Sequence, residues 1–596
     1  MSEESGAGSG VEGAGAGVAR GVPGADWATR VADVADALEA IEQDRGLLAH
    51  VDDELRMRLL QAAGRVSRPD RHARKALARE QQRETRRAER NEDEALLART
   101  GIRTLREAPI FQTPLRLTRG PATPGEAGRL ALGEGMLPGE QGGAVVGAGD
   151  PGESDATVQL EPVTHGPHPG DTRRHLLGEA APEQVGPAGQ VGPAGQVGPV
   201  GPTEPLGETH EERTCYVCRA PYRAVHHFYD HMCISCGDFN FAKRTPEADL
   251  RGRTALVTGA RVKIGYQAAI MLLRAGAQVV VLTRFPHDAA RRYAAEADYD
   301  DWADRLVIHG IDLRHTPSVE RLCDVLNATL DRLDFIINNA CQTVRRPPGF
   351  YGHLMAFESD VAALGERERR LLGDGGLVGS SSTVGGEPGL VTGRVGVASA
   401  QMTQLELLRE DRERGEQLFP SGALDADQQQ VDLREVNSWR LKLADVTAVE
   451  LLEVHLVNAV APFILNARLK PLMCRTPERD KHIVNVSAME GQFYRVFKTD
   501  RHPHTNMAKA ALNMMTRTSA ADYIEDGIHM NSVDTGWVTD EDPDHHARLK
   551  REVHRFHPPL DIVDGAARIV DPIFHGVRTG EHVWGQFLKD YMVTDW

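Results

Sequence analysis

The stretch T-A-L-V-T-G-A-R-V-K-I-G-Y-Q-A-A-I-M-L-L-R-A-G-A-Q-V-V-V-L-T at 254–283 decides the fold of this 596-residue chain. The apolar run at 255–257 predicts a buried strand, and Gly259 marks the tight turn that follows it. A helix with one apolar stripe is expected to open at Gly265, and the run at 279–282 predicts the next strand. The stretch therefore predicts a βαβ unit.

The glycines of this unit lie where the pyrophosphate of a dinucleotide would sit. Backbone N–H groups and the helix dipole favour an anion at the start of such a helix. A glycine-rich turn alone is a weak signal. Because a strand precedes it and a helix and second strand follow, we interpret it as dinucleotide-binding rather than as a structural turn.

The totals limit the classes of protein that fit. With 596 residues the chain should hold two or more independent regions. The net charge of −17 argues against general attraction to nucleic acid or to an anionic membrane. No uninterrupted apolar run is long enough to span a bilayer, and the acidic, Gly-rich start is unlike a signal peptide. These features predict a cytoplasmic protein that does not bind a membrane.

The first 210 residues divide by composition. Residues 1–25 are rich in Gly, Ala and Ser and are expected to be disordered, and 26–108 show helical spacing. The basic run at 71–90 could contact RNA or DNA, but it has Glu/Arg pairs at helical spacing and no aromatic residue. We therefore favour a solvated helix. Residues 109–210 predict a Gly/Pro-rich flexible linker whose collagen-like repeat is too short for a triple helix.

The segment 211–245 contains two C-x2-C pairs separated by fourteen residues. This spacing can bring four thiolates to a tetrahedral zinc ion, namely those of Cys215, Cys218, Cys233 and Cys236. The alternatives are a reduced dithiol pair without metal, or one of the intervening histidines in place of a thiolate. No open coordination position is implied. The prediction is a structural zinc that supplies much of the folding energy of a small module.

From residue 250 to 596 strand and helix patterns alternate, which predicts an α/β, doubly wound, mainly parallel Rossmann-type sheet. The expected strands are 255–257, 279–282, 306–309, 335–338, 483–486, 530–533 and a short one near 583–587. Residues 355–430 read as an insertion that could be a lid or a mobile loop.

Five motifs of this region resemble those of the short-chain dehydrogenase/reductase family. They are T-G-A-R-V-K-I-G at 258–265, D-L at 312–313, N-N-A-C at 338–341, V-N-A-V-A-P-F at 457–463 and D-T-G-W-V-T at 534–539. Lys263, Cys341 and Thr535 stand where the family has glycine, glycine and proline. We regard Cys341 as a small packing residue. The resemblance runs from about residue 253 to the end of the chain, interrupted by the insertion.

The resemblance implies a nicotinamide cofactor, a small-molecule substrate and a homo-oligomer. The cofactor-binding residues that it implies are Gly259, Arg261, Lys263, Ile264, Gly265, Arg284, Asp312, Leu313, Asn339, Ala340, Lys509 and Val538. Arg284 ends the second strand, where an NAD-specific enzyme usually has an acid. Arg261 and Lys263 add positive charge near a 2′-phosphate. We therefore expect NADP to be preferred, with NAD possible.

The departures from the family concern the acid/base residues. Ala488 stands at the position of the catalytic serine, with Ser487 one residue early, and Thr505 replaces the tyrosine four residues before Lys509. A tyrosine next to Lys⁺ can donate a proton near neutral pH, whereas an aliphatic hydroxyl is far less acidic. Cofactor binding is therefore expected to remain while the usual proton donor is missing.

A substitute acid could come from the extra loop at 492–504, which carries Tyr494, His502 and His504. Surface positions are the simpler interpretation for each of these three. The candidate catalytic set from the sequence is Asn458, Lys509, Thr505 and Tyr494.

Two functions of different classes remain open from the sequence. The first is an NADP-dependent oxidoreductase with a non-standard proton donor. The second is a nucleotide-binding sensor or scaffold without turnover, for which the zinc module or the N-terminal helices could bind a protein partner. An RNA-binding function led by residues 71–90 is a distant third.

Overall fold

The computed structural model describes residues 25–108, 110–114, 204–372, 395–413, 415–494, 498–539, 541–553 and 555–596. The chain forms two compact units, Met1–Glu92 and Asp93–Trp596. The expected disorder at 1–24, most of the linker and its collagen-like repeat lie outside the described residues, as do residues 373–394 of the insertion.

The first unit is helical. Its elements are α1 (Ala25–Gln43), a short 3-10 helix η1 (Arg45–His50), α2 (Asp53–Ser67) and most of α3 (Arg71–Ala98). The Asp52 carboxylate accepts the Leu55 N–H at 2.8 Å, and the Asp70 carboxylate accepts the Ala73 N–H at 2.7 Å. These two side chains cap α2 and α3 because they satisfy N–H groups that have no partner inside the helix.

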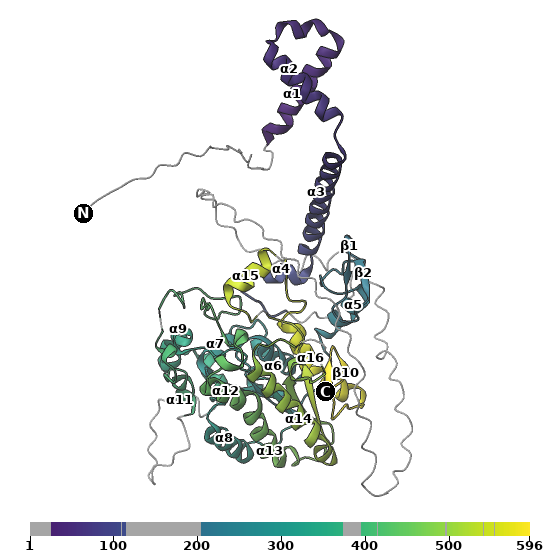
Figure 1. Ribbon diagram of the computed structural model, residues 1–596. Coiled ribbons are helices and arrows are strands. Elements are labelled where there is room, and N and C mark those ends of the chain that lie inside the picture. The colour runs from purple at the N-terminus through teal and green to yellow at the C-terminus, as the bar shows by residue number, and fades with distance from the viewer. Residues whose placement is uncertain are drawn as a thin grey trace, which may run out of the picture. The chain divides into compact units, whose positions relative to one another are not determined.

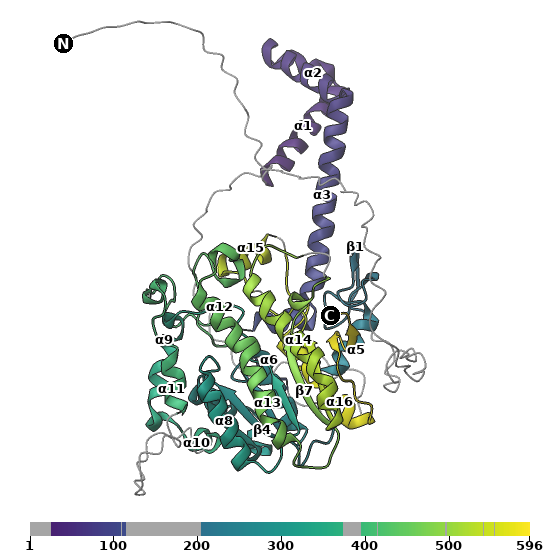
Figure 2. The same cartoon turned by 60° about the horizontal axis from the view of Figure 1, so that its bottom comes forward.

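The second unit is built on an eight-stranded sheet in the order β10-β9-β8-β7-β6-β3-β4-β5 (Figures 1 and 2). All the strands run parallel except β10, which is antiparallel to β9. They are β3 (Thr254–Thr258), β4 (Gln278–Thr283), β5 (Leu306–Gly310), β6 (Phe335–Asn338), β7 (Lys481–Ser487), β8 (Ile528–Asp534), β9 (Phe587–Lys589) and β10 (Met592–Thr594). The predicted doubly wound Rossmann sheet is confirmed.

Both faces of the sheet are covered because alternate residues of each strand point to opposite sides. Ala255 and Val257 of β3 belong to a core shared with α6 and α16, whereas Leu256 belongs to a core shared with α8, α13 and α14. The helices around the sheet are α6 (Lys263–Arg274), α7 (Pro286–Ala294), α8 (Thr316–Thr329), α12 (Ala448–His455), α13 (Ala461–Met473), α14 (Pro503–Glu525), α15 (Asp544–Glu552) and α16 (Ile562–Thr579).

Two local expectations need correction. The helix expected to open at Gly265 begins at Lys263, and the last strands begin at Phe587 rather than near 583. Val583 and Trp584 are exposed, and the Gly585 N–H bonds to the Met530 carbonyl at 2.8 Å in a turn, so the chain reaches the sheet later than its apolar residues suggested.

One helical stretch of the described residues, Ala448–Met473, is long and apolar enough to cross a membrane. Its apolar residues are interrupted by charged and polar ones such as Glu450, Glu453 and Asn458, so the sequence did not indicate such a stretch. Leu465, Leu469 and Leu472 of this stretch are fully buried in the core beside the sheet, which accounts for its composition.

Three helices lie in or next to the insertion, which are α9 (Pro348–Ser359), α10 (Glu366–Leu371) and α11 (Val395–Met402). The Ser399 hydroxyl of α11 donates to the Arg284 carbonyl after β4, whereas Arg367 and Arg370 of α10 pair with Asp300 and Asp304 before β5. A small antiparallel hairpin, β1 (Glu208–Thr214) with β2 (Pro221–Ala224), and α5 (Ile234–Lys243) form a separate layer. The short α4 (Gly101–Glu107) joins this layer, because the N–H groups of Gly101 and Ile102 donate to the carbonyls of His227 and Phe228 at 3.0 and 2.9 Å.

Candidate cofactor site and zinc-binding module

The glycine turn after β3 is held by the segment that follows β6. The Asn339 side chain donates to the carbonyls of Thr258 and Gly259 at 3.1 and 3.2 Å. A Cβ on Gly259 would lie 2.8 Å from the Ala340 Cα, and a Cβ on Gly265 would lie 2.3 Å from the Asn339 Nδ2. The two glycines are therefore needed for the close approach of two loops at the C-terminal edge of the sheet.

Lys263 replaces a family glycine, yet its backbone has φ of 57°, the left-handed region that glycine favours. A non-glycine residue in this region costs on the order of 1–2 kcal/mol. The turn thus keeps the conformation of a glycine turn and adds an ammonium group at the start of α6, where anions bind. This local geometry fits a dinucleotide.

Carboxylates lie near this ammonium group. Its Nζ lies 3.9 Å from the Asp427 Oδ2. Burial raises the pKa of Glu541, but the charges of Lys263 and Arg346 outweigh it and hold that pKa below its ordinary value. Burial raises the pKa of Asp427 above its ordinary value. A phosphate at this turn would have to compete with these acidic groups.

Asp427 belongs to residues 423–430 of the insertion, which we call the strap. The carbonyls of Asp427 and Gln428 accept hydrogen bonds from Arg292 at 2.9 and 3.0 Å. The Phe111 N–H bonds to the carbonyl of Ala426 at 2.9 Å. The strap therefore lies over the start of α6 and over α7, next to the glycine turn.

The guanidinium of Arg261 is already engaged by other side chains and is not available to a phosphate. It is buried, and its guanidinium donates to the Asp288 carboxylate at 2.6 Å and to the Gln429 side chain at 3.1 Å. Its charge is already compensated by a residue of α7, which the sequence pattern could not indicate. Its placement departs from the sequence expectation.

Arg284 lies at the end of β4 as expected. Its guanidinium donates to the Tyr351 hydroxyl at 2.8 Å and lies 4.8 Å from the centre of that ring. The tyrosine comes from α9, just before the insertion, so this helix helps to orient the residue expected to select the cofactor.

Asp312 and Leu313 follow β5, at the edge expected for the adenine. Asp312 accepts the Arg314 guanidinium at 2.6 Å, and Arg314 also reaches Glu453 at 2.8 Å. Burial raises the pKa of Asp312, but Arg314 outweighs it and holds that pKa below its ordinary value. Arg314 was missed in the sequence, where only its position two residues after Asp312 could have suggested a partner.

Asn458 lies in a π-helical turn, Leu456–Val460, between α12 and α13. Its side chain accepts the Gln342 N–H at 2.7 Å and donates to the Gln342 carbonyl at 3.1 Å. Such π-turns occur often at functional sites. Here the turn brings Asn458 to the segment after β6 and holds it in place.

Lys509 is buried on α14, and its ammonium donates to the Val486 carbonyl at 2.7 Å. A Cβ on Gly491, which ends the short 3-10 helix η9 (Met489–Gly491), would lie 2.7 Å from the Lys509 carbonyl carbon. The end of β7 and the start of α14 are thus packed closely together. Ala488, at the family's serine position, lies within this junction.

The four candidate proton donors are placed differently. The Thr505 hydroxyl is buried and has no hydrogen-bond partner within the described residues. His504 is buried too, and its Nε2 lies 3.6 Å from the Glu450 carboxylate of α12. His502 is stacked on Trp439, with ring centres 4.0 Å apart. Tyr494 is 88% exposed, so the structure does not bring it together with Lys509.

The four cysteines of the small layer converge. Their sulfur atoms all lie within 4.8 Å of one another, and the Cys218 and Cys233 sulfurs are 3.8 Å apart. A tetrahedral zinc with Zn–S bonds near 2.3 Å requires S···S separations of about 3.8 Å. The arrangement fits a zinc ion with four thiolate ligands.

Two of the nearby histidines, His226 and His231, have other partners. The His226 Nδ1 accepts the N–H groups of Phe228 and Tyr229 at 3.0 and 3.2 Å, and the His231 Nδ1 lies 2.8 Å from the Asp230 carboxylate.

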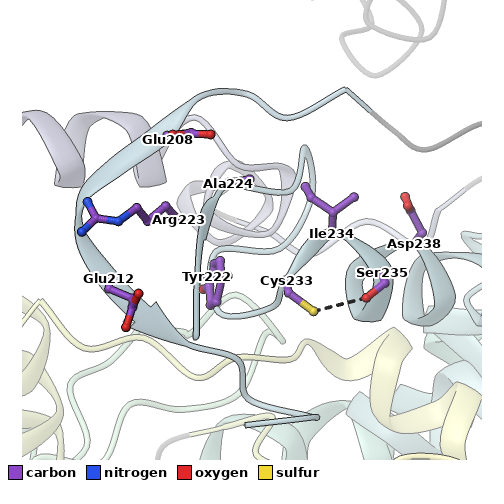
Figure 3. Close-up of a pocket in the computed structure, with 9 residues that line it drawn as sticks. All are labelled: Glu208, Glu212, Tyr222, Arg223, Ala224, Cys233, Ile234, Ser235 and Asp238. Carbon is purple, nitrogen blue, oxygen red and sulfur yellow. Dashed lines mark hydrogen bonds between the residues drawn. The ribbon is translucent and has the colours of Figure 1, made fainter. Parts of the chain in front are cut away.

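A hollow lies between the hairpin and α5, beside Cys233 (Figure 3). On its wall the Cys233 Sγ lies 3.4 Å from the Ser235 Oγ.

The hairpin, α5 and the four cysteines form a layer that we call the cysteine module, and buried charges join it to α16. The Arg244 guanidinium donates to Asp561 at 2.8 Å and to Asp564 at 2.9 Å, and all three side chains are buried. The Tyr229 hydroxyl donates to Asp564 at 2.5 Å.

The module also reaches the loop after β8. The Tyr216 hydroxyl accepts the Trp537 N–H at 3.0 Å. Gly536 has φ of 76°, and a Cβ there would lie 2.4 Å from a Leu560 methyl group. The loop that carries Val538, expected to lie near the nicotinamide, is thus held by the cysteine module on one side.

Sheet order, glycine turn and loop positions define a Rossmann-type nucleotide-binding domain. Two family models match it, "short chain dehydrogenase" over residues 253–350 and "Enoyl-(Acyl carrier protein) reductase" over 436–558. The two matched segments therefore belong to the short-chain dehydrogenase/reductase family, whose members are oxidoreductases.

Individual relatives match different lengths. An uncharacterized protein of Acanthamoeba polyphaga mimivirus, R665, is 28% identical over 395 residues, which cover 63% of this chain and 74% of the relative. Dehydrogenase/reductase SDR family member 13 of Bos taurus is 33% identical over 116 residues, 18% of this chain and 30% of the relative. The other curated relatives are likewise spanned over only 23% to 41% of their length.

Among solved structures, an NADPH-bound carbonyl reductase from chicken fatty liver matches 58% of this chain and all of its own length. The identity is 17% and the TM-score 0.35.

Proposed function

We propose that the protein is an oxidoreductase that prefers NADP(H) to NAD(H) and uses His504 instead of a tyrosine as proton donor. When bound, the cofactor would exchange a hydride with the carbonyl carbon of a small-molecule substrate. The observation that carries the proposal is a buried histidine beside a buried carboxylate, one residue before Thr505 and five before Lys509.

The cofactor part of the proposal rests on charge. Arg284 at the end of β4 can pair with a 2′-phosphate, and Lys263 brings an ammonium group to the pyrophosphate position. Lys509 offers N–H donors to ribose hydroxyl groups. Gly259, Ile264, Gly265, Asn339, Ala340 and Val538 would line the cofactor through the backbone, and Asp312 with Leu313 would border the adenine.

The proton-transfer part rests on the chemistry of the two candidate groups. An imidazole has an ordinary pKa close to neutral, whereas an aliphatic hydroxyl such as that of Thr505 does not release a proton in this range. Burial raises the pKa of Glu450, but its contacts with His504 and Ser438 outweigh it and keep that pKa below its ordinary value. A charged Glu450 would orient the ring of His504, which would give its proton to the carbonyl oxygen as the hydride arrives.

The test is a screen of aldehydes, ketones and alcohols with both cofactors, followed by variants. His504→Ala should lower kcat by about 100-fold or more with little change in NADP(H) affinity. Thr505→Val should keep a large share of turnover, and Lys509→Ala should weaken cofactor binding. Tyr494→Phe is the matched control and should behave as wild type. A loss of most turnover in Thr505→Val, with His504→Ala active, would make Thr505 the catalytic hydroxyl.

A second candidate function is favoured by the strap. Because Asp427 faces Lys263 and Arg261 is paired with Asp288, the domain could bind NADP weakly and act as a sensor or scaffold without turnover. In that case calorimetry would detect NADP(H) binding, no substrate of the screen would react, and none of these variants would have turnover to lose.

We also propose a homo-oligomer and a structural zinc held by the four cysteines. Large apolar side chains are exposed on neighbouring helices, namely Leu452 of α12, Phe463 of α13, and Met507 and Met514 of α14. Such a surface suits association with a second copy. Sedimentation of the full chain tests the oligomer, and Phe463→Glu should shift it toward the monomer.

A further inference from the structure

Three histidines from distant parts of the sequence meet at the edge of the sheet opposite the cofactor site. His482 and His529 are the second residues of β7 and β8, and His582 follows α16. The register of the sheet pairs His482 with His529 directly. Because these strands are parallel, their N-terminal ends lie at the edge away from the glycine turn. We call these residues the three-histidine cluster.

The ring nitrogens of the cluster converge. One nitrogen from each of the three rings lies within 4.8 Å of the others. The His482 Nε2 and the His582 Nδ1 are 3.0 Å apart, and the ring centres are 4.5 to 5.1 Å apart. A tetrahedral ion with Zn–N bonds of 2.0–2.1 Å requires N···N separations of about 3.3 Å. Small ring rotations would complete that geometry.

The hydrogen bond of His529 fixes how it could act as a ligand. Its Nδ1 lies 3.1 Å from the Lys481 carbonyl oxygen, which can only accept. The Nδ1 must therefore carry the proton, and the Nε2 keeps its lone pair. Metal-binding histidines are commonly oriented by this kind of contact between the second ring nitrogen and a carbonyl.

A glycine leaves the space that the rings occupy. A Cβ on Gly576 of α16 would lie 2.3 Å from the His582 Nδ1 and 3.0 Å from the His482 Nε2. Glycine inside a helix is otherwise unfavourable relative to alanine. Its presence there is explained by the close approach of two imidazole nitrogens.

The cluster also contains an unsatisfied polar atom. His482 is fully buried, and its Nδ1 has no hydrogen-bond partner within the described residues. The nitrogen close to His582 is the His482 Nε2, so an ion in the cluster would bind Nε2 and leave Nδ1 protonated. The converging nitrogens, rather than this atom, indicate the ligand.

We propose that the three-histidine cluster binds a divalent transition-metal ion of the zinc class. Imidazole nitrogens suit zinc, copper and nickel, whereas magnesium and calcium prefer oxygen ligands. The ion would join β7, β8 and the chain after α16, and water would fill its fourth position. The site is separate from the four cysteines and does not depend on the proposed oxidoreductase function.

The first test is the zinc content of the full chain, purified without chelator, loaded with Zn²⁺ and freed of excess metal. Wild type should hold two zinc ions per chain, and both His582→Gln and Cys233→Ser should hold one. His545→Gln, an exposed histidine of α15, is the matched control and should hold two. Gly576→Ala should lose the same ion as His582→Gln, because its methyl group enters the space of the rings.

A spectroscopic test does not depend on the folding of a histidine variant. Co²⁺ added to the Cys233→Ser protein should give visible d–d bands without a strong sulfur-to-metal band, and Zn²⁺ should displace it. In addition, Zn²⁺ should raise the Tm of Cys233→Ser but not that of a Cys233→Ser, His582→Gln double variant. One zinc per wild-type chain, unchanged by His582→Gln, together with no cobalt spectrum in Cys233→Ser, would overturn the proposal.

Discussion

The cysteine module and the strap both pack against the nucleotide-binding domain, but through contacts of different kinds. The module is joined by the buried guanidinium of Arg244 between Asp561 and Asp564. The strap lies next to the glycine turn through the longer Lys263–Asp427 contact of 3.9 Å and backbone carbonyls on Arg292. The charged groups of the first set are buried and fully paired. The second set includes a carboxylate at the place where a phosphate is expected.

This difference predicts that the module stays attached to the domain, whereas a bound ligand can displace the strap. Breaking a fully buried ion pair leaves an uncompensated charge and is costly. Replacing the Asp427 contact of Lys263 by a phosphate contact keeps the ammonium group paired. The module should therefore stay in place through any cofactor cycle, and the strap is the part expected to respond.

The largest effect is expected at the metal site of the module. Cys233→Ser should release about one zinc per chain and unfold the region around 204–245, because the metal supplies much of the folding energy of so small a layer. Zinc analysis and limited proteolysis measure both results. Cys474→Ser, an exposed cysteine elsewhere, is the control and should keep its zinc. Wild-type protein without zinc at the cysteines would remove the basis of this prediction.

The next effect concerns the joint itself. Arg244→Met should lower the free energy of unfolding by about 3–5 kcal/mol, because it leaves Asp561 and Asp564 buried without their cation. Arg251→Met removes an exposed pair with Asp249 and should leave the stability nearly unchanged, because solvent screens such a pair. Chemical denaturation of both variants measures the difference. Equal stability of the two would show that the joint is not held by its charges.

At the end of β4, Arg284→Asp should reverse the preference between NADP and NAD. The aspartate would repel a 2′-phosphate and could accept a ribose 2′-hydroxyl, so the ratio of NADP to NAD affinity should fall by about tenfold or more. Calorimetry with both cofactors measures the ratio. Equal affinities already in the wild type would contradict the assignment of Arg284.

The smallest effect is expected from the strap carboxylate. Asp427→Asn should tighten NADP(H) binding a few-fold, because it removes one negative charge near the pyrophosphate position. Burial raises the pKa of Asp427, so acidification should neutralise it earlier than an ordinary aspartate. The wild-type affinity should therefore rise as the pH falls toward that raised pKa, and this rise should be smaller in Asp427→Asn. Asp500→Asn, far more exposed, should leave both affinity and pH profile unchanged.

The parts that were predictable from the sequence are those controlled by local pattern. The strand at 335–338 is found as Phe335–Asn338, because a short, fully buried strand shows up directly as an apolar run. The four cysteines meet because their spacing almost dictates it. The left-handed backbone of Lys263 could not be predicted from the sequence, because lysine rarely adopts this conformation and the surrounding turn imposes it.

Contacts between residues that are distant in the sequence could not be predicted from local patterns. Arg261 pairs with Asp288 of α7, and a βαβ pattern does not reveal which charges face each other. His482, His529 and His582 come together through strand register and the end of a helix. The exposed position of Tyr494 also follows from how the loop runs rather than from its composition.

The hydrogen bond between Tyr216 and Trp537 has a consequence for modularity. The sequence suggests that the family domain starts near residue 250, yet one loop of it is anchored to a residue that precedes this boundary. A fragment cut there would expose Asp561 and Asp564 and release the loop at Trp537. The family domain is therefore not expected to fold as an autonomous unit when it is cut at residue 250, because its contacts continue into the cysteine module.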